Sequence, residues 1–266
     1  SPYTTGVVNA LSVTTITGSA ADLIVVYTAK EAGTITFSTD EAITVSGSIT
    51  VAQFNYLAAN NDGVITATIS EGDMATLEGI TESGNALAIT VTDTTVSAAE
   101  LNTLDSKTTT DLTVTSSTIT GTAADLIAAY TATGSINGLG NEAITLSDTS
   151  VDAEVLINLD ALTSGIIWSD SQNPRFTDTI TGTAAQFITL FEANAAGSIT
   201  GLENEAITLS DTSVDASVLI DLDAFTSGMI DAASITTLTG SDSDQATARA
   251  SSGIIGLPQS LSLIHI

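Results

Sequence analysis

The chain has 266 residues, with 31 acidic side chains against four basic ones, and its formal net charge is −27. This charge repels nucleic acid and anionic lipid, so we expect no nucleic-acid binding. The chain has no cysteine, which excludes disulfide and thiolate chemistry. It also lacks a run of roughly 18 apolar residues, so we expect no membrane insertion. Hydrophobic residues make up 43% but aromatic residues only 4%, so the core must be aliphatic.

From the N-terminus onward, strand-like segments recur, each followed by a polar turn and a short amphipathic helix. Their central isoleucines are spaced by about 27 residues, which is in the range of solenoid repeats. The stretch NEAITLSDTSVDA occurs both at Asn141–Ala153 and at Asn204–Ala216, so two alternating repeat types recur as a pair. The central residues are Ile16, Ile43, Ile69, Ile89, Ile119, Ile144, Ile180, Ile207 and Ile235.

Each repeat carries the signals of a helix start after its strand. A Ser, Thr or Asp side chain at this point can accept hydrogen bonds from the free N–H groups of the first helical turn. In several repeats an Asp, Glu or Gln follows three residues later, which is a capping-box pattern. The predicted N-caps are Ser19, Thr50, Asp73, Ser97, Thr122, Asp152, Thr183 and Asp215. The predicted capping boxes are Ser19/Asp22, Thr50/Gln53, Ser97/Glu100, Thr122/Asp125 and Thr183/Gln186.

Large apolar residues four positions after the cap, and again at seven or eight, predict helices of about three turns with one buried stripe. The first positions are Leu23, Phe54, Leu77, Leu101, Leu126, Leu156, Phe187 and Leu219. The second positions are Tyr27, Leu57, Ile80, Leu104, Tyr130, Leu159, Leu190 with Phe191, and Leu222. Glycines are predicted to end several helices, after which a second short strand begins. These glycines are Gly33, Gly63, Gly134, Gly165, Gly197 and Gly228.

The expected fold is an α/β solenoid of about nine stacked coils, with parallel sheets along the stack. Each coil of roughly 27 residues contains a strand, a turn, a second strand and a short helix, and neighbouring coils cover its apolar face. Residues 1–240 are expected to form one repeat solenoid with an enlarged coil at 166–180, and residues 241–260 a degenerate last coil. The segment 261–266, LSLIHI, breaks the pattern and is expected to be a non-native tail.

No catalytic constellation is found in the sequence, and we expect that the chain is not an enzyme. Its single histidine, His265, lies in the irregular tail, so neither a nucleophile–histidine pair nor a zinc site is expected. Paired carboxylates, as in a carbohydrate-active enzyme, are the remaining catalytic alternative. The aspartates, however, recur in register, whereas an active site occurs once. They are Asp93, Asp148 and Asp211 after the strand and Asp105, Asp160 and Asp223 late in the helix.

Two interpretations of these aspartate rows are open. They are either turn, cap and surface residues, or a ladder that binds divalent cations such as calcium. Calcium requires six to eight clustered oxygen ligands, and the sequence contains neither an EF-hand loop nor a GGxGxD repeat. Asp93, Asp148 and Asp211 are the candidate metal ligands, and no other cofactor is predicted.

The enlarged coil contains the single tryptophan of the chain, Trp168, together with Pro174, Arg175 and Phe176. Insertions in repeat proteins project from one face and often bind a partner, and aromatic residues beside arginine are typical of contact surfaces. Trp168, Arg175 and Phe176 are therefore candidate contacts for a ligand or partner. The alternative is a tolerated loop whose aromatic side chains fold back onto the stack.

The phrases TITGTAADLIAAY, GLGNEAITLSD and AAELNTLD carry a resemblance that covers most of residues 10–240. The chain resembles the tandem repeats of very large, adhesin-like cell-surface or secreted proteins of marine bacteria, cyanobacteria included. The resemblance implies an extracellular or cell-surface location and a non-enzymatic role as stalk, coat or adhesive array. The expected partners are neighbouring repeats of the parent protein, and open strand edges predict end-to-end self-association. The alternative is a calcium-binding or ligand-binding repeat module.

Overall fold

The computed structural model describes residues 6–132, 134–169 and 179–258. These residues form nine helices and twenty strands, and the strands pair in parallel. The chain packs as two compact units, of which unit 1 contains Ser1–Ser117 and Ala128–Leu139 and unit 2 contains Thr118–Ile127 and Gly140–Ile266. The predicted α/β class with parallel sheets is therefore confirmed.

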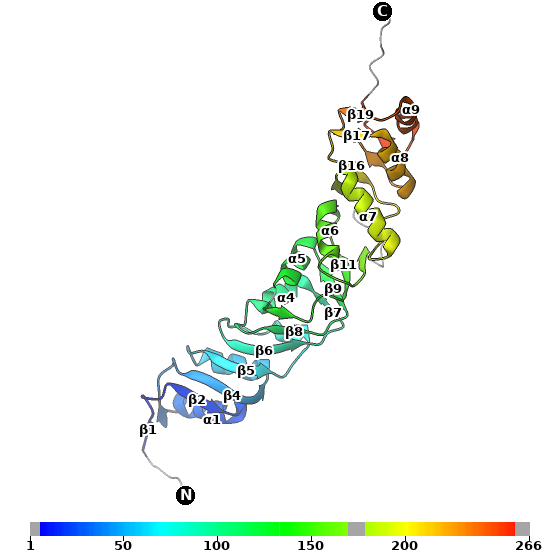
Figure 1. The fold of residues 1–266 in the computed structure, drawn as a ribbon. Helices are drawn as coiled ribbons and strands as arrows, with labels where there is room; N and C mark the ends of the chain where they lie inside the picture. The colour runs from blue at the N-terminus through cyan, green and yellow to red at the C-terminus, as the bar shows by residue number, and fades with distance from the viewer. Residues whose placement is uncertain (1–5, 133, 170–178, 259–266) are drawn as a thin grey trace, which may run out of the picture. The chain divides into compact units, whose positions relative to one another are not determined.

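Unit 1 is built around a six-stranded parallel sheet of order β10-β8-β6-β5-β4-β2, and Figure 1 shows β2, β4, β5, β6 and β8 side by side in this order. A separate pair joins β1 to β3. The strands of unit 1 are β1 (Val8–Asn9), β2 (Thr15–Gly18), β3 (Ile35–Thr36), β4 (Ala42–Ile49), β5 (Ile65–Ile69), β6 (Ala86–Val91), β7 (Thr95–Ser97), β8 (Leu112–Val114) and β10 (Ile136–Asn137). Its helices are α1 (Ala20–Glu31), α2 (Val51–Ala59), α3 (Met74–Leu77) and α4 (Ala98–Asp105).

Unit 2 contains parallel strands in the order β9-β11-β13-β15, a second sheet of order β12-β14-β16-β18-β20, and the pair β17-β19. Helix α5 (Ala123–Thr131) starts within the first chain segment of this unit. The strands are β9 (Thr118–Gly121), β11 (Ala143–Leu146), β12 (Ser150–Asp152), β13 (Ile167–Ser169), β14 (Thr179–Gly182), β15 (Ile199–Thr200), β16 (Ile207–Leu209), β17 (Ser213–Asp215), β18 (Ile230–Asp231), β19 (Thr237–Thr239) and β20 (Ile254–Ile255). The other helices are α6 (Ala153–Asp160), α7 (Ala184–Ala196), α8 (Ala216–Phe225) and α9 (Asp242–Ala250).

Isoleucine aligns with isoleucine from one repeat to the next. In unit 1, Ile43 pairs with Ile16 on one side and with Ile65 on the other. In unit 2, Ile180, Ile207, Ile230 and Ile254 form a row across four successive strands. Since parallel strands require a crossover connection, the helix of each repeat returns the chain to the start of the next strand. Each unit thus repeats the same strand-to-strand step, while one nine-coil solenoid over residues 1–240 stays a prediction.

The predicted helix stripes form the core. The eight residues predicted four positions after the caps are each at most 1% exposed, and the second set is buried as well. Complete burial of such a side chain stabilises the fold by about 1.5–3 kcal/mol. The spacing of apolar residues therefore predicted the buried face of every helix from α1 to α8.

The predicted N-caps are confirmed. The five predicted capping boxes, however, are of two kinds. Thr50, Ser97 and Thr183 form reciprocal capping boxes with the Gln or Glu three residues later. The hydroxyls of Ser19 and Thr122 instead donate to the carboxylates of Asp22 and Asp125, at 2.7 Å in both cases. An aspartate side chain is one methylene shorter than that of a glutamate, so its carboxylate lies beside the hydroxyl group of the N-cap residue.

The predicted role of three glycines is wrong. Gly197 does end α7 in the left-handed conformation, with φ 83°. Gly63, Gly165 and Gly228, however, lie three to five residues beyond the ends of α2, α6 and α8, and their φ is not positive. A Cβ at Gly165 would lie 1.9 Å from the carbonyl oxygen of Glu142, and a Cβ at each of the other two glycines would lie 1.9–2.2 Å from the equivalent glutamate carbonyl oxygen. These glycines are required for a close approach of two repeats rather than for a helix end.

The repeat that contains β5 and α3 is shortened, because α3 has four residues whereas α4 has eight. The last repeat keeps helix α9, in which Ala248 is the buried residue, followed by β20. The tail 261–266 lies outside the described residues. None of the described helices combines the length and the apolar character that a membrane-spanning segment needs.

Candidate functional site

The first aspartate row caps the helices of the preceding repeats. One carboxylate oxygen of each aspartate accepts a hydrogen bond from the N–H group of the first residue of a helix. The pairs are Asp93 with Met74 of α3 at 2.6 Å, Asp148 with Ala123 of α5 at 2.7 Å, and Asp211 with Ala184 of α7 at 2.7 Å. Each carboxylate satisfies an otherwise unpaired N–H group at the positive end of a helix dipole.

Glu71 has the same role for α2 and was not predicted. Its two carboxylate oxygens lie 3.3 and 3.2 Å from the N–H nitrogen of Val51, the first residue of that helix. The row therefore recurs in both units, and in each case the acid lies 19–27 residues beyond its donor. The signal in the sequence was an acidic residue about one repeat length after the start of each of these four helices, α2, α3, α5 and α7.

The second aspartate row joins the ends of helices in successive repeats. Asp105, Asp160 and Asp223 lie in the last turns of α4, α6 and α8. Each accepts a hydrogen bond from a serine hydroxyl that follows the helix of the next repeat. The distances are 3.0 Å for Ser135 to Asp105, 3.3 Å for Ser198 to Asp160, and 2.7 Å for Ser251 to Asp223. The two rows thus bind the opposite ends of the helices.

The N-cap aspartates of α3 and α8 accept hydrogen bonds from residues of their own helices. The Oδ1 atom of Asp73 accepts from the Thr76 hydroxyl at 2.7 Å, and that of Asp215 accepts from the Ser217 hydroxyl at 2.8 Å. These hydroxyl donors, followed by the backbone N–H groups of the same residues, lower the pKa of both carboxyl groups. Both side chains stay charged and are held in their capping positions at neutral pH.

A third acidic position lies directly before β11. Glu142 is 4% exposed, and its Oε2 atom accepts from the N–H groups of Gly140 at 2.7 Å and Asn141 at 3.1 Å. The next repeat reaches back to this turn, because the Ser164 N–H donates to the Gly140 carbonyl at 2.8 Å. Gly165 also lies in close contact with the Glu142 carbonyl, so two contacts join this turn to the next repeat.

The equivalent residue directly before β4, Glu41, is 1% exposed, and its carboxylate oxygens have no hydrogen-bond partner among the described residues. Nearby, the Tyr27 hydroxyl donates to Asn61 Oδ1 at 2.9 Å. Burial, and then the charge of Glu41, raise the pKa of Tyr27. Unlike Glu142, Glu41 is therefore a buried carboxylate that accepts no hydrogen bond from the described backbone around it.

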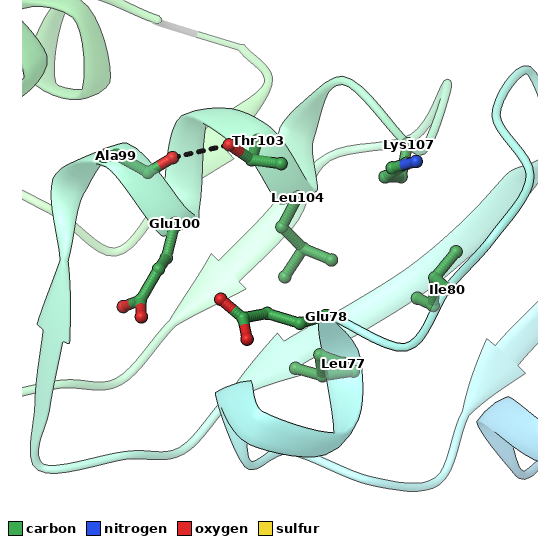
Figure 2. Close-up of a pocket in the computed structure, with 8 residues that line it drawn as sticks. All are labelled: Leu77, Glu78, Ile80, Ala99, Glu100, Thr103, Leu104 and Lys107. Carbon is green, nitrogen blue, oxygen red and sulfur yellow. Dashed lines mark hydrogen bonds between the residues drawn. The ribbon is translucent and has the colours of Figure 1, made fainter.

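A groove of about 360 Å³ lies between α3 and α4 in unit 1 (Figure 2). It forms because α3 ends after four residues. The buried side chains of Leu77, Ile80 and Leu104 line it, with Glu78 and Glu100 also on its wall. The Glu100 carboxylate accepts from the Ser97 N–H at 3.0 Å, so it belongs to the capping box of α4. The groove follows from the helix lengths and was not predicted.

The structure therefore places Asp93, Asp148 and Asp211 at separate helix starts, where each has a capping role. Within the described ranges, no three or more His, Asp or Glu side chains are grouped so that they could hold a metal ion. The calcium ladder stays a prediction. Trp168 lies in β13, where its backbone pairs with Thr145 and Thr200. Arg175 and Phe176 lie outside the described residues, so the predicted contact surface is untested.

Comparisons of the chain with protein-family models, with curated proteins and with solved structures gave no match. The function is therefore inferred from the residues of the chain and their contacts.

Proposed function

We propose that this chain is a non-enzymatic structural repeat segment of a large extracellular or cell-surface protein, where it acts as a stalk, coat or adhesive array. In this proposal the repeats stack as an α/β solenoid of about nine coils, and the partners of each repeat are its neighbours. The observation that carries the proposal is the hydrogen bond that the first N–H group of a helix donates to an acidic side chain one repeat later, which recurs in both units.

The use of the acidic residues supports a structural role. An active site needs its carboxylates once, in one place, whereas here each row repeats the same contact at several helices. The remaining surface charge keeps a protein of net charge −27 soluble and is screened at high ionic strength. A segment with these properties suits a salty medium outside the cell.

Single-molecule stretching tests the proposal. Because each repeat contacts only its neighbours, unfolding is expected in several steps whose contour lengths are multiples of one repeat. A repeat of about 27 residues at roughly 3.5 Å per residue adds about 90 Å of extended chain. Refolding on relaxation is expected as well, because a load-bearing segment must recover. A single event that releases the whole chain would contradict the proposal.

The alternative is a repeat module that binds calcium or another ligand, with Asp93, Asp148 and Asp211, or Trp168 to Phe176, as contacts. The buried Glu41 carboxylate, which has no donor among the described residues, is the observation that favours a cation. Calorimetric titration with calcium distinguishes the two. Saturable binding that is lost in Asp148→Asn or Trp168→Ala would support the alternative.

A further inference from the structure

Strand β2 has the sequence TITG, as does β14, but the two strands have different neighbours. In unit 2, β14 lies between β12 and β16 and is paired on both edges. In unit 1, β2 ends the sheet and is paired with β4 on one edge. Its other edge has no strand partner within the described part of the chain.

The side chains around the free edge are more exposed than their equivalents. Ile16 of β2 is half-buried, whereas Ile180 of β14 is 2% exposed. Val8 and Val13 beside it are 43% and 37% exposed. A groove of about 330 Å³ opens there, lined by apolar side chains of β1, β2, β3 and α1 and by the ring of Phe37. We name this surface of unit 1 the β2 face.

Unit 2 shows twice which segment covers such an edge. Beside β14 lies the strand Ser150–Asp152, which leads into α6, and beside β19 lies Ser213–Asp215, which leads into α8. Both segments begin with S-V-D-A. In both pairs a threonine hydroxyl lies 3.4 Å from an aspartate Oδ2 atom, Thr181 with Asp152 and Thr239 with Asp215. Thr17 is the corresponding threonine of β2.

The glycines that end β2 and β14 give an independent indication. A Cβ at Gly182 would lie 2.7 Å from the Cβ of Ala153, so glycine makes room for the first helical residue of the covering segment. At Gly18, a Cβ would meet only Asp22 and Leu23 of its own repeat, at 3.6 Å or more. Folding of unit 1 alone therefore does not require glycine there, whereas docking of an S-V-D-A segment does.

We propose that the β2 face docks an S-V-D-A strand followed by its amphipathic helix, supplied by another repeat of this type. The inference rests on the proposed structural function and names the partner surface through which repeats join. The strand would extend the ladder at β2, its aspartate would receive the Thr17 hydroxyl, and its alanine would contact Gly18.

The charges select between the two S-V-D-A segments of the chain. In α7 the third helical residue is Gln186, whose amide donates to Glu154 Oε2 of the covering segment at 3.3 Å. In α1 that position is Asp22, which would repel a glutamate. The segment Ser213–Phe225 has Ser217 in place of Glu154. The β2 face is therefore suited to the Ser213–Phe225 type.

The test uses the full chain and a fluorescent peptide with the sequence of residues 211–227, measured by anisotropy in about 0.5 M NaCl to screen the acidic repulsion. Saturable binding is expected for the wild-type chain. Gly18→Ala should weaken it at least tenfold while leaving the melting temperature of the chain unchanged. A peptide with Ser217→Glu should bind more weakly, and Asp22→Asn in the chain should restore its binding.

A second measurement covers the case in which the free peptide is too weakly helical to bind. The same segment is joined to the N-terminus of the chain by a Gly/Ser linker, which supplies a millimolar effective concentration. The tether should raise the melting temperature of the chain, but not that of the Gly18→Ala variant. Absence of binding and of this rise, or equal effects in both chains, would overturn the proposal. Neither result would alter the stepwise unfolding expected of the stack itself.

Discussion

Replacement of Asp148 by alanine removes the carboxylate that accepts from the Ala123 N–H at 2.7 Å. A hydrogen bond to a charged group contributes about 1.5–3 kcal/mol, and a charge at a helix start about 0.3–1 kcal/mol. Asp148 is half-buried, so water can reach the vacated N–H group and reduce the loss. We expect the free energy of unfolding to fall by about 1–2 kcal/mol, which lowers the melting temperature by about 2–8 °C.

The assay is thermal unfolding followed by circular dichroism in the presence of EDTA. The control is Glu192→Ala on α7, which makes the same charge change at an exposed position and should leave the midpoint almost unchanged. An Asp148→Ala midpoint equal to that of the wild type in EDTA would refute the capping role. If the variant differed from the wild type only when calcium was present, Asp148 would be a metal ligand instead.

Three further substitutions test other contacts between and within repeats. Gly165→Ala forces a Cβ onto the Glu142 carbonyl, and we expect a loss of about 1–3 kcal/mol in denaturant unfolding. Leu219→Ala empties a fully buried position of α8 and should cost about 2–5 kcal/mol in the same assay. The pKa of Asp215 is lowered from 3.8 by the Ser217 hydroxyl, so its stabilising effect is present above pH 4 and is lost as the pH falls through the folded-state value. Asp215→Asn should therefore show a weaker loss of stability on acidification, and an acid profile equal to that of the wild type would contradict this assignment.

The sequence predicts the local part of this fold well. Leu156 and Leu159 could be assigned to the buried stripe of α6 because helical spacing places them on one face, whatever the next repeat contains. The N-cap Thr183 could be identified for the same reason, since its partner Gln186 is three residues away. These signals depend on neighbours within one turn.

The contacts between repeats could not be assigned in the same way. Asp148 and its donor Ala123 are 25 residues apart, so their approach depends on the register of two strands. From the sequence, the repeated aspartate is compatible with a helix cap and with a metal ligand, and the strand register adds the capping contact. The groove of Figure 2 lies beside the short helix α3, and it was not predicted either.

Thermal unfolding in calcium, in magnesium and in sodium chloride at matched ionic strength tests most directly whether the acidic rows hold the repeats together by themselves. Screening of a net charge of −27 acts in all three salts, so we expect equal midpoints and a fully folded chain in EDTA. A cation that binds specific sites of the folded state raises the midpoint by mass action. A large rise in calcium alone would contradict the structural role of the aspartate rows and would favour a calcium-dependent array.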